Sequence, residues 1–269
     1  MSLLEQTPGL MSAFGGEMIP KFLATRSVEG IPNVVPCISM RPAEDQEDTL
    51  FFGNFLLRKS IKNLQGDCRV GILVVTPDLQ GWILKGDFIE FQNSGPYVDR
   101  QKSGSLLRYN AYTGVRNAGL IRLLSLEGTF AISKLRVLKD YWLARLAAIG
   151  QGHDRKILPR NGLIIPLAVK LEFARMAAVK VLAWLGPEGY PQVIPSLSLQ
   201  PAGQKNLACW KNAAFPSPAA RALVAANILT AEAISYQAKG RWEESKRLGI
   251  LRVEEIYAGG PPYPGGRVA

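Results

Sequence analysis

The sequence has little of the chemistry that builds metal centres or disulfide frameworks. Its 269 residues include only three cysteines, Cys37, Cys68 and Cys209, and a single histidine, His153. An odd number of widely spaced cysteines argues against a disulfide framework or a CxxC metal site, and it fits a reducing cytoplasm. One histidine, expected in a loop, is poor evidence for a metal ligand set. We therefore expect a cytoplasmic protein without a metal site.

Long apolar runs and a basic leader are also missing. No stretch reaches the ~18 uninterrupted apolar residues of a membrane span. The N-terminal segment MSLLEQTPGL lacks the basic and apolar regions of a signal peptide. Hydrophobic residues at 47% and charged residues at 20% are typical of a globular protein with a core. The length suits one large domain or two domains of ordinary size. Without a membrane span or a signal peptide, no membrane partner is expected.

The formal net charge of +10 is concentrated in the middle of the chain. Residues 100–160 contain twelve basic and three acidic side chains, a net charge of +9. Such a segment could attract nucleic acid, a nucleotide tail or a membrane surface, or it could be a solvated surface. No nucleic-acid-binding motif accompanies the charge, so nucleic acid is the disfavoured partner.

Short strands and tight turns dominate the first part of the chain. Apolar or β-rich runs fall at 22–25, 33–40, 50–52, 70–75, 82–91 and 123–132. Glu29-Gly30 indicates a hairpin turn, and the glycine of Lys85-Gly86 indicates a bulge within a strand. The pattern predicts a small β-barrel with one helix.

A helix is expected after the last of these strands. Residues 134–149 show helical periodicity, and Gly150-Gln151-Gly152 is expected to end the helix. The apolar residues of one face are Leu135, Leu138, Trp142, Leu146 and Ile149.

The first hairpin returns later in the chain. Lys180–Pro201 matches Lys21–Pro42 without a gap at an offset of 159. Ten of 22 positions are identical, namely 21, 23, 24, 29, 30, 32, 34, 36, 39 and 42. Lys239-Gly240 echoes Lys85-Gly86 at an offset of 154, so the second copy is shorter in between. Self-similarity at a fixed offset predicts an internal repeat. We expect a first barrel over 1–133, a helical linker over 134–160 and a second barrel over 161–269.

A basic turn stands between an expected strand and an expected helix. The stretch GNFLLRKSIKNL, Gly53–Leu64, includes Arg58, Lys59 and Ser60 at the helix start, with Asn54 and Asn63 nearby. Unpaired N–H groups and the dipole at a helix start favour anions. Two cations and a hydroxyl there predict a phosphate site, and a solvated turn capped by Ser60 is the alternative.

The repeat provides an internal control for this turn. At the offset of 159, Asn54, Arg58, Lys59, Ser60 and Asn63 fall on Ala213, Ser217, Pro218, Ala219 and Ala222, whereas Leu64 falls on Leu223. On this alignment the apolar scaffold is retained and the polar residues are lost. This comparison favours one anion site per chain and a degenerate second copy.

These motifs resemble a known family. The hairpin EGIPNVVP, the basic turn and the KG strand look like the FMN-binding split barrel of the pyridoxamine 5′-phosphate oxidase superfamily. The resemblance covers Lys21–Phe91 well and Lys180–Tyr257 in part. It implies a mainly β fold with helices (α+β), as two split barrels forming an intrachain pseudo-dimer.

The resemblance also implies a cofactor site. FMN would be held at its phosphate by Arg58, Lys59 and Ser60, with Asn54 and Asn63 nearby. The backbone of Val35, Pro36 and Cys37 would lie along the isoalloxazine ring. Trp210 of the second barrel would cover that ring. The sequence lacks the arginine-rich C-terminal end of the true oxidases, so pyridoxamine phosphate is not the expected substrate.

Two classes of function remain open. The first is a flavin-dependent oxidoreductase with FMN and an unknown small-molecule substrate, in which the flavin supplies the redox chemistry. No residue stands out as a general acid or base. The second is a non-enzymatic module or sensor that binds a flavin, a deazaflavin or another anionic cofactor, with haem disfavoured by the single histidine. The chain is expected to be a monomer, closed as a pseudo-dimer, or a homodimer.

Overall fold

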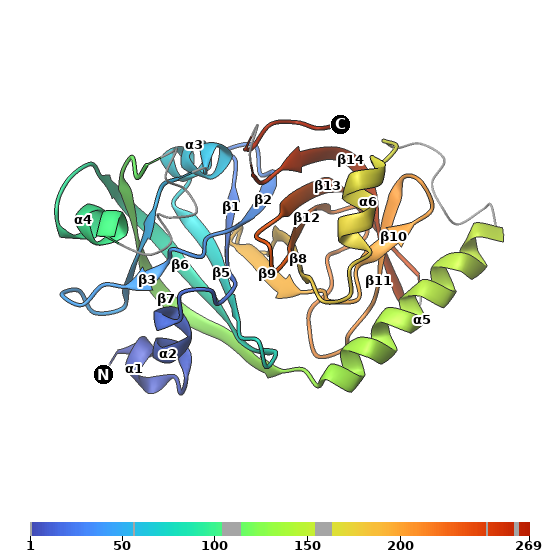
Figure 1. Cartoon of the computed structure of the whole chain (residues 1–269), viewed down its shortest axis with the longest axis horizontal. Coiled ribbons are helices and arrows are strands. Elements are labelled where there is room, and N and C mark those ends of the chain that lie inside the picture. The colour runs from blue at the N-terminus through green and yellow to red at the C-terminus, as the bar shows by residue number, and fades with distance from the viewer. Residues whose placement is uncertain (1, 56, 104–113, 154–162, 246, 261–263) are drawn as a thin grey trace. The chain divides into compact units, whose positions relative to one another are not determined.

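The computed structural model describes residues 2–55, 57–103, 114–153, 163–245, 247–260 and 264–269, and side chains at 150–153 are left out. The chain divides into two compact units (Figure 1). The first comprises Met1–Ala131 with Leu185–Gln192, and the second comprises Ile132–Trp184 with Val193–Ala269. Part of the basic segment, residues 104–113 and 154–160, lies outside the described residues.

The first unit is built on one antiparallel seven-stranded sheet in the order β2-β1-β5-β6-β7-β4-β3. Its strands are β1 (Lys21–Arg26), β2 (Pro32–Pro36), β3 (Arg41–Pro42), β4 (Thr49–Gly53), β5 (Arg69–Val75), β6 (Gln80–Gln92) and β7 (Ala118–Ala131). Its helices are α1 (Leu3–Gln6), α2 (Leu10–Gly15), α3 (Arg58–Gly66) and α4 (Pro96–Ser103). The main core joins α2, α3 and the sheet through side chains such as Phe14, Leu64 and Ile72.

The second unit contains a sheet in the order β10-β11-β14-β13-β12-β8-β9, apart from the residues at the β8–β9 turn, 185–192, that group with the first unit. Its strands are β8 (Val179–Leu185), β9 (Pro191–Pro195), β10 (Gln200–Ala202), β11 (Asn206–Trp210), β12 (Leu223–Leu229), β13 (Ser235–Glu244) and β14 (Leu248–Ala258). Its helices are α5 (Lys134–His153) and α6 (Leu167–Phe173). Read in reverse, this strand order repeats that of the first unit. The prediction of a mainly β protein with helices in two copies is therefore confirmed.

Special backbone positions recur in both copies. The β1–β2 turn needs a positive φ at Gly30, 78°, and the β8–β9 turn needs one at Gly189, 79°. The register shifts at Lys85/Gly86 in β6 and at Lys239/Gly240 in β13, which confirms the predicted bulge and repeats it. A Cβ at Gly86 would lie 2.6 Å from the Arg122 carbonyl oxygen, so the bulge excludes a side chain there.

The repeat extends further towards the N-terminus than the sequence comparison indicated. Helix α2 precedes β1 as helix α6 precedes β8. Leu10 and Phe14 of α2 are buried, as are Val169 and Phe173 of α6, and both pairs keep the offset of 159. Each copy therefore begins with a short helix that places an aromatic ring in the core.

The constant offset is wrong beyond the first hairpin. Gly53 of β4 pairs with Ala118, and Trp210 of β11 pairs with Leu248 at the same place in the second sheet. The backbone N–H of Asn54 donates to Asn117, and that of Lys211 donates to Arg247. The counterpart of Asn54 is thus Lys211, at an offset of 157, and not Ala213.

The second copy also lacks helix α3. The segment 211–222 joins β11 directly to β12 without a helix, and Leu223 begins β12. Leu223 is therefore not the counterpart of Leu64, which is buried in α3. Pro216 and Pro218 explain the difference, because proline removes a backbone donor and disrupts a helix interior. The scaffold of the basic turn was not retained, so the residue-by-residue control fails.

Helix α5 confirms the helix expected from residue 134 onwards and extends it. It continues through Gly150–Gly152 to His153, so the predicted loop position of the histidine is wrong. Glycine weakens a helix by ~1 kcal/mol and does not always end it. Figure 1 shows α5 running along β10 and β11 of the second unit.

Candidate functional site

The basic turn lies where strand β4 gives way to helix α3. The helix begins at Arg58, and its N-cap residue, Leu57, makes no side-chain hydrogen bond to the first turn. The predicted cap by Ser60 is therefore wrong. The first N–H groups keep no side-chain cap, and the positive end of the dipole adds to the charge of Arg58 and Lys59. The helix start therefore provides a local electropositive site.

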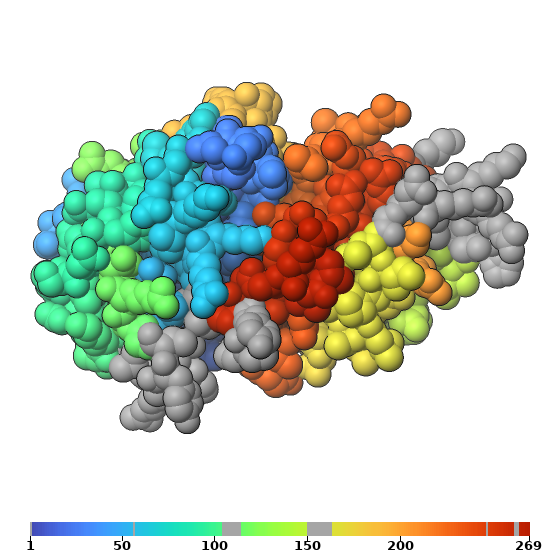
Figure 2. Space-filling view, turned by 90° about the horizontal axis from the view of Figure 1, so that it is seen from above, coloured from blue at the N-terminus to red at the C-terminus, as the bar shows by residue number. Residues whose placement is uncertain are grey.

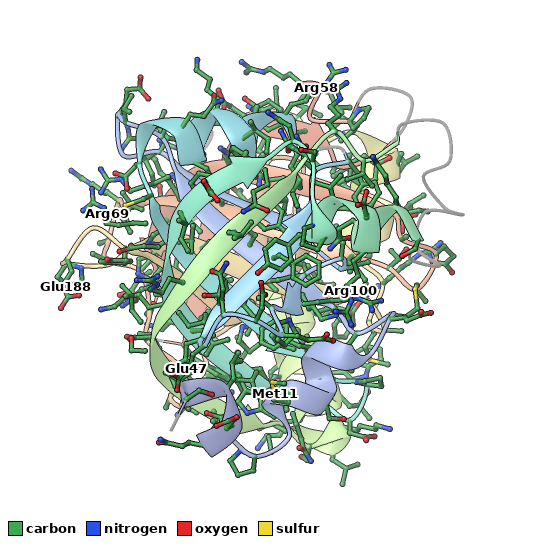
Figure 3. The ribbon with its side chains drawn as sticks, turned by 90° about the vertical axis from the view of Figure 1, so that its left-hand side faces the viewer. Met11, Glu47, Arg58, Arg69, Arg100 and Glu188 are labelled. Carbon is green, nitrogen blue, oxygen red and sulfur yellow. The ribbon has the colours of Figure 1, made fainter. Side chains whose placement is uncertain are left out.

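Arg58 and Lys59 differ in exposure. Arg58 is exposed, and Figure 3 shows its side chain at the edge of the molecule, directed away from the sheet. Lys59 is half-buried. In Figure 2 the residues of α3 form part of the outer surface of the first unit, next to the β1–β2 turn. A ligand from solvent can therefore approach Arg58 and the exposed part of the Lys59 side chain.

Ser60 and Asn63 face the sheet. The Ser60 hydroxyl is buried and accepts a hydrogen bond of 3.1 Å from the Asn33 amide of β2. The Asn63 amide donates a hydrogen bond of 3.0 Å to the Thr25 hydroxyl of β1. These two contacts fix the helix against β1 and β2. The Ser60 O–H is still able to donate, and the predicted roles of Ser60 and Asn63 beside a phosphate stay predictions.

An ion-pair cluster holds the far end of α3. The carboxylate of Asp67, the C-cap residue, lies 3.1 Å from Arg26 and 2.7 Å from Arg69. The hydrogen bond from Arg69 is the main cause that lowers the pKa of Asp67. Asp67 therefore stays ionised and keeps the helix oriented.

Asn54 brings a distant segment to the basic turn. Asn54 is buried, its N–H donates to the Asn117 carbonyl at 2.9 Å, and its carbonyl accepts from the Arg116 N–H at 3.3 Å. The side-chain Oδ1 of Asn117 is buried without a hydrogen-bond partner. Arg116 adds a third, exposed cation to the surroundings of the turn. Sequence reasoning missed both residues because nothing local signals a pairing across more than sixty positions.

The backbone predicted to lie along a flavin ring falls on strand β2 and on Cys37, the residue after it. Strand β2 is an edge strand whose only neighbour in the described sheet is β1. Val35 and Pro36 are half-buried, whereas Cys37 is buried in the core. Burial raises the pKa of the Cys37 thiol to about 12, so this thiol is not a nucleophile at neutral pH. Because Asn33 of the same strand contacts Ser60, β2 and the basic turn form one continuous region.

Trp210 belongs to the second unit. It ends β11, and its backbone N–H donates to the Ser198 hydroxyl at 3.1 Å. In the first unit the backbone N–H of Gly53 donates to the Ser39 hydroxyl in the same way. Trp210 lines a cavity of about 60 Å³ within the second unit, together with Trp242, Phe215 and Lys211. The structure thus places Trp210 beside a cavity of its own unit, and its predicted role over a flavin ring stays a prediction.

Other types of site are absent from the described residues. No group of three or more potential metal ligands occurs in the described part of the chain. The three cysteines are all free, with Cys68 exposed. None of the helices in the described ranges is long and apolar enough to cross a membrane.

Comparison with known proteins gives matches to solved structures. No protein-family model and no curated protein matches the chain. An FMN-binding protein from Syntrophomonas wolfei is 18% identical over 49% of this chain and 88% of its own, with a TM-score of 0.41. A protein from Lactobacillus delbrueckii, provisionally assigned as a pyridoxamine 5′-phosphate oxidase, is 20% identical over 46% and 93%, with a TM-score of 0.32. The haem storage protein HutZ from Vibrio cholerae is 14% identical over 49% and 95%, with a TM-score of 0.34. Each match covers about half of this chain.

Proposed function

We propose that the first unit binds a flavin, FMN, with its phosphate at the start of α3. The observation that carries the proposal is the pair of adjacent cations, Arg58 and Lys59, on the first turn of a helix that has no side-chain cap. Phosphate is an acceptor of several hydrogen bonds, and such a helix start offers charge and N–H donors together. The turn has no helical counterpart in the second unit, so one site per chain is expected.

The surrounding residues fit the rest of the cofactor. The buried Oδ1 of Asn117 lacks a donor, and a ribityl hydroxyl is a donor. The edge strand β2, through Val35 and Pro36, offers a half-buried wall for an apolar ring. When bound, a flavin supplies electron or hydride transfer. The chain's own residues would hold the phosphate, orient the ring and exclude water from one of its faces.

The first test is the affinity for FMN of matched variants. Removing both cations by Arg58→Ala and Lys59→Ala is expected to weaken FMN binding by at least about 100-fold, because each of the two charge-assisted contacts contributes ~1.5–3 kcal/mol. The control is Lys62→Ala, an exposed cation one turn further along the same helix. Its FMN affinity should stay within a few-fold of the unmodified protein.

The outcomes separate the functional classes. Protein that takes up FMN and oxidises a reduced nicotinamide or another donor is an oxidoreductase. Protein that takes up FMN with no turnover is a binding module or sensor. A purified protein that is colourless and takes up no added FMN would contradict both classes. Equal losses of affinity in the double variant and in Lys62→Ala would contradict the assignment of the phosphate site to Arg58 and Lys59.

A further inference from the structure

Helix α5 has apolar side chains on two opposite faces. On the inner face, Tyr141 and Ala144 are buried, and Ala144 packs in a cluster with Ala202 of β10 and Ala208 of β11. Small side chains thus let this helix lie close against its own sheet. The inner face packs α5 against its own sheet. It does not account for the large apolar residues of the helix, which lie elsewhere on its surface.

The outer face carries the large residues. The α5 stripe, defined here as five apolar residues, has exposed fractions between 40% and 79%. Its members are Leu135, Leu138, Trp142, Leu146 and Ile149. They expose roughly 500 Å² of apolar surface, which lies within the ~300–600 Å² of the largest patch on a typical monomer, a patch that is often functional. It is more than half of the ~800 Å² per partner in a typical stable interface. An apolar stripe on a helix normally packs against a core or a partner.

The α5 stripe is symmetric about its central residue. Leu138 and Leu146 are each four residues from Trp142, and Leu135 and Ile149 are each seven residues from it. A two-fold interface requires a surface that is complementary to itself. If two α5 helices pack antiparallel with the Trp142 residues at the axis, Leu135 meets the partner's Ile149 and Leu138 meets the partner's Leu146. Helical spacing at four and seven residues gives this symmetry, and in a two-fold pair it leaves no residue of the stripe without an apolar partner.

The charges beside the stripe permit the same arrangement. Lys139 and Arg145 flank Trp142 at three residues on either side, and they therefore lie on opposite edges of the stripe. In the antiparallel pair, Lys139 lies beside the partner's Leu146, and Arg145 lies beside the partner's Leu138. Neither cation faces a like charge, and the Arg145 guanidinium lies 5.9 Å from the Trp142 ring centroid.

We propose that the α5 stripe joins two copies of this chain into a homodimer by antiparallel helix packing. The inference is independent of cofactor binding, because it uses no residue of the basic turn. It assigns α5 a role at both of its faces, holding its own sheet on one and a second chain on the other.

The oligomeric state tests the proposal directly. Light scattering after size exclusion should give the mass of two chains at micromolar concentration, and Leu146→Glu should give the mass of one. The matched control is Leu167→Glu, the same substitution at an exposed leucine of α6, outside the stripe. It should remain dimeric. Circular dichroism should show that both variants stay folded, which exposed positions allow.

Disulfide cross-linking tests the direction of packing in a Cys68→Ser background. A mixture of Leu135→Cys protein and Ile149→Cys protein should form the mixed cross-linked dimer. Leu135→Cys alone should not cross-link, because the antiparallel pair separates its two copies by the length of the stripe. Self-cross-linking by Leu135→Cys would overturn the antiparallel arrangement.

Three other results would overturn the proposal. The first is a single-chain mass at every concentration, as expected if another part of the same chain covers the stripe. The second is binding to anionic phospholipid vesicles that Leu146→Glu abolishes, which would make the stripe a membrane-contacting surface. The third is loss of the dimer in Leu167→Glu, which would place the interface elsewhere.

Discussion

Lys180 is buried and its amine has no hydrogen-bond partner, so replacing it should change how the free energy of unfolding depends on pH. The side chain is fully buried in β8, and its Nζ has no hydrogen-bond partner, with the Tyr141 ring centroid 5.3 Å away. Burial lowers the pKa of Lys180 to about 7. The perturbation is Lys180→Met, which keeps a similar length and removes the amine.

The sign and size of the effect follow from proton linkage. In unfolded chains the pKa of lysine is ~10.4, so between pH 7 and that value the native state binds fewer protons than the unfolded state. Stability therefore rises with pH in this window, and below pH 7 the cost of the buried charge is constant and largest. With the pKa of Lys180 at about 7, the rise from pH 7 to pH 9 is about 2 kcal/mol. Lys180→Met removes this rise, and it should stabilise the second unit most at or below pH 7.

Urea unfolding at pH 7 and pH 9, followed by tryptophan fluorescence, measures the difference. Four of the five tryptophans lie in the second unit, namely Trp142, Trp184, Trp210 and Trp242. The advantage of Lys180→Met over the unmodified protein should shrink by about 2 kcal/mol between the two pH values. Parallel stabilities at both pH values would refute the reasoning.

The equivalent lysine of the first unit serves as the control. Lys21 is also buried, but its Nζ donates to the carbonyls of Gly16 at 3.0 Å and Ile38 at 3.2 Å. Burial lowers the pKa of Lys21 to about 8, a smaller change than at Lys180. Lys21→Met leaves two carbonyls unpaired, so it should stabilise the protein less than Lys180→Met or destabilise it.

Three further substitutions or reactions test separate parts of the structure. A thiol reagent should modify the exposed Cys68 quickly and the two buried thiols only on unfolding, and three equal rates would contradict the burial. Ser60→Ala should lower the free energy of unfolding by ~1–3 kcal/mol in chemical denaturation, because it leaves a buried amide without its acceptor. Gly240→Ala should cost ~1–3 kcal/mol, since its Cβ would lie 1.8 Å from a carbonyl oxygen, whereas Gly260→Ala, with nothing within 4 Å, should be nearly neutral in thermal unfolding.

The sequence predicted the repeated fold because the hairpin positions are under strict local constraints. The turn glycines Gly30 and Gly189 need a positive φ, and the strand glycines Gly86 and Gly240 need room at a bulge. Such positions tolerate few substitutions, so both copies keep them. The start of α3 at Arg58 was predictable for a similar reason, since an apolar strand, a polar turn and helical spacing follow one another directly.

The site could be predicted only in part, because its remaining members come from distant segments. Asn33 and Thr25 contact α3 through the tertiary fold, and Asn117 reaches Asn54 through the β4–β7 pairing. A fixed offset also could not follow shorter loops in the second copy, which is why Lys211 was not recognised as the counterpart of Asn54. Periodicity identified helix α5, but it could not tell that the large apolar residues face outward while the small ones face the sheet.

The central claim is that Arg58 and Lys59 hold the phosphate of a flavin. It is tested most directly by comparing the affinity of FMN with that of riboflavin, which lacks the phosphate, in the unmodified protein and in the double variant Arg58→Ala, Lys59→Ala. We predict that FMN binds at least about 100-fold more tightly than riboflavin to the unmodified protein, because two charge-assisted contacts contribute ~3 kcal/mol or more and each ~1.4 kcal/mol is a factor of ten. The advantage of FMN should fall at least about 100-fold in the double variant, to the part supplied by the N–H groups of the helix start, while riboflavin binding is unchanged. An FMN advantage of undiminished size in the double variant would contradict the account.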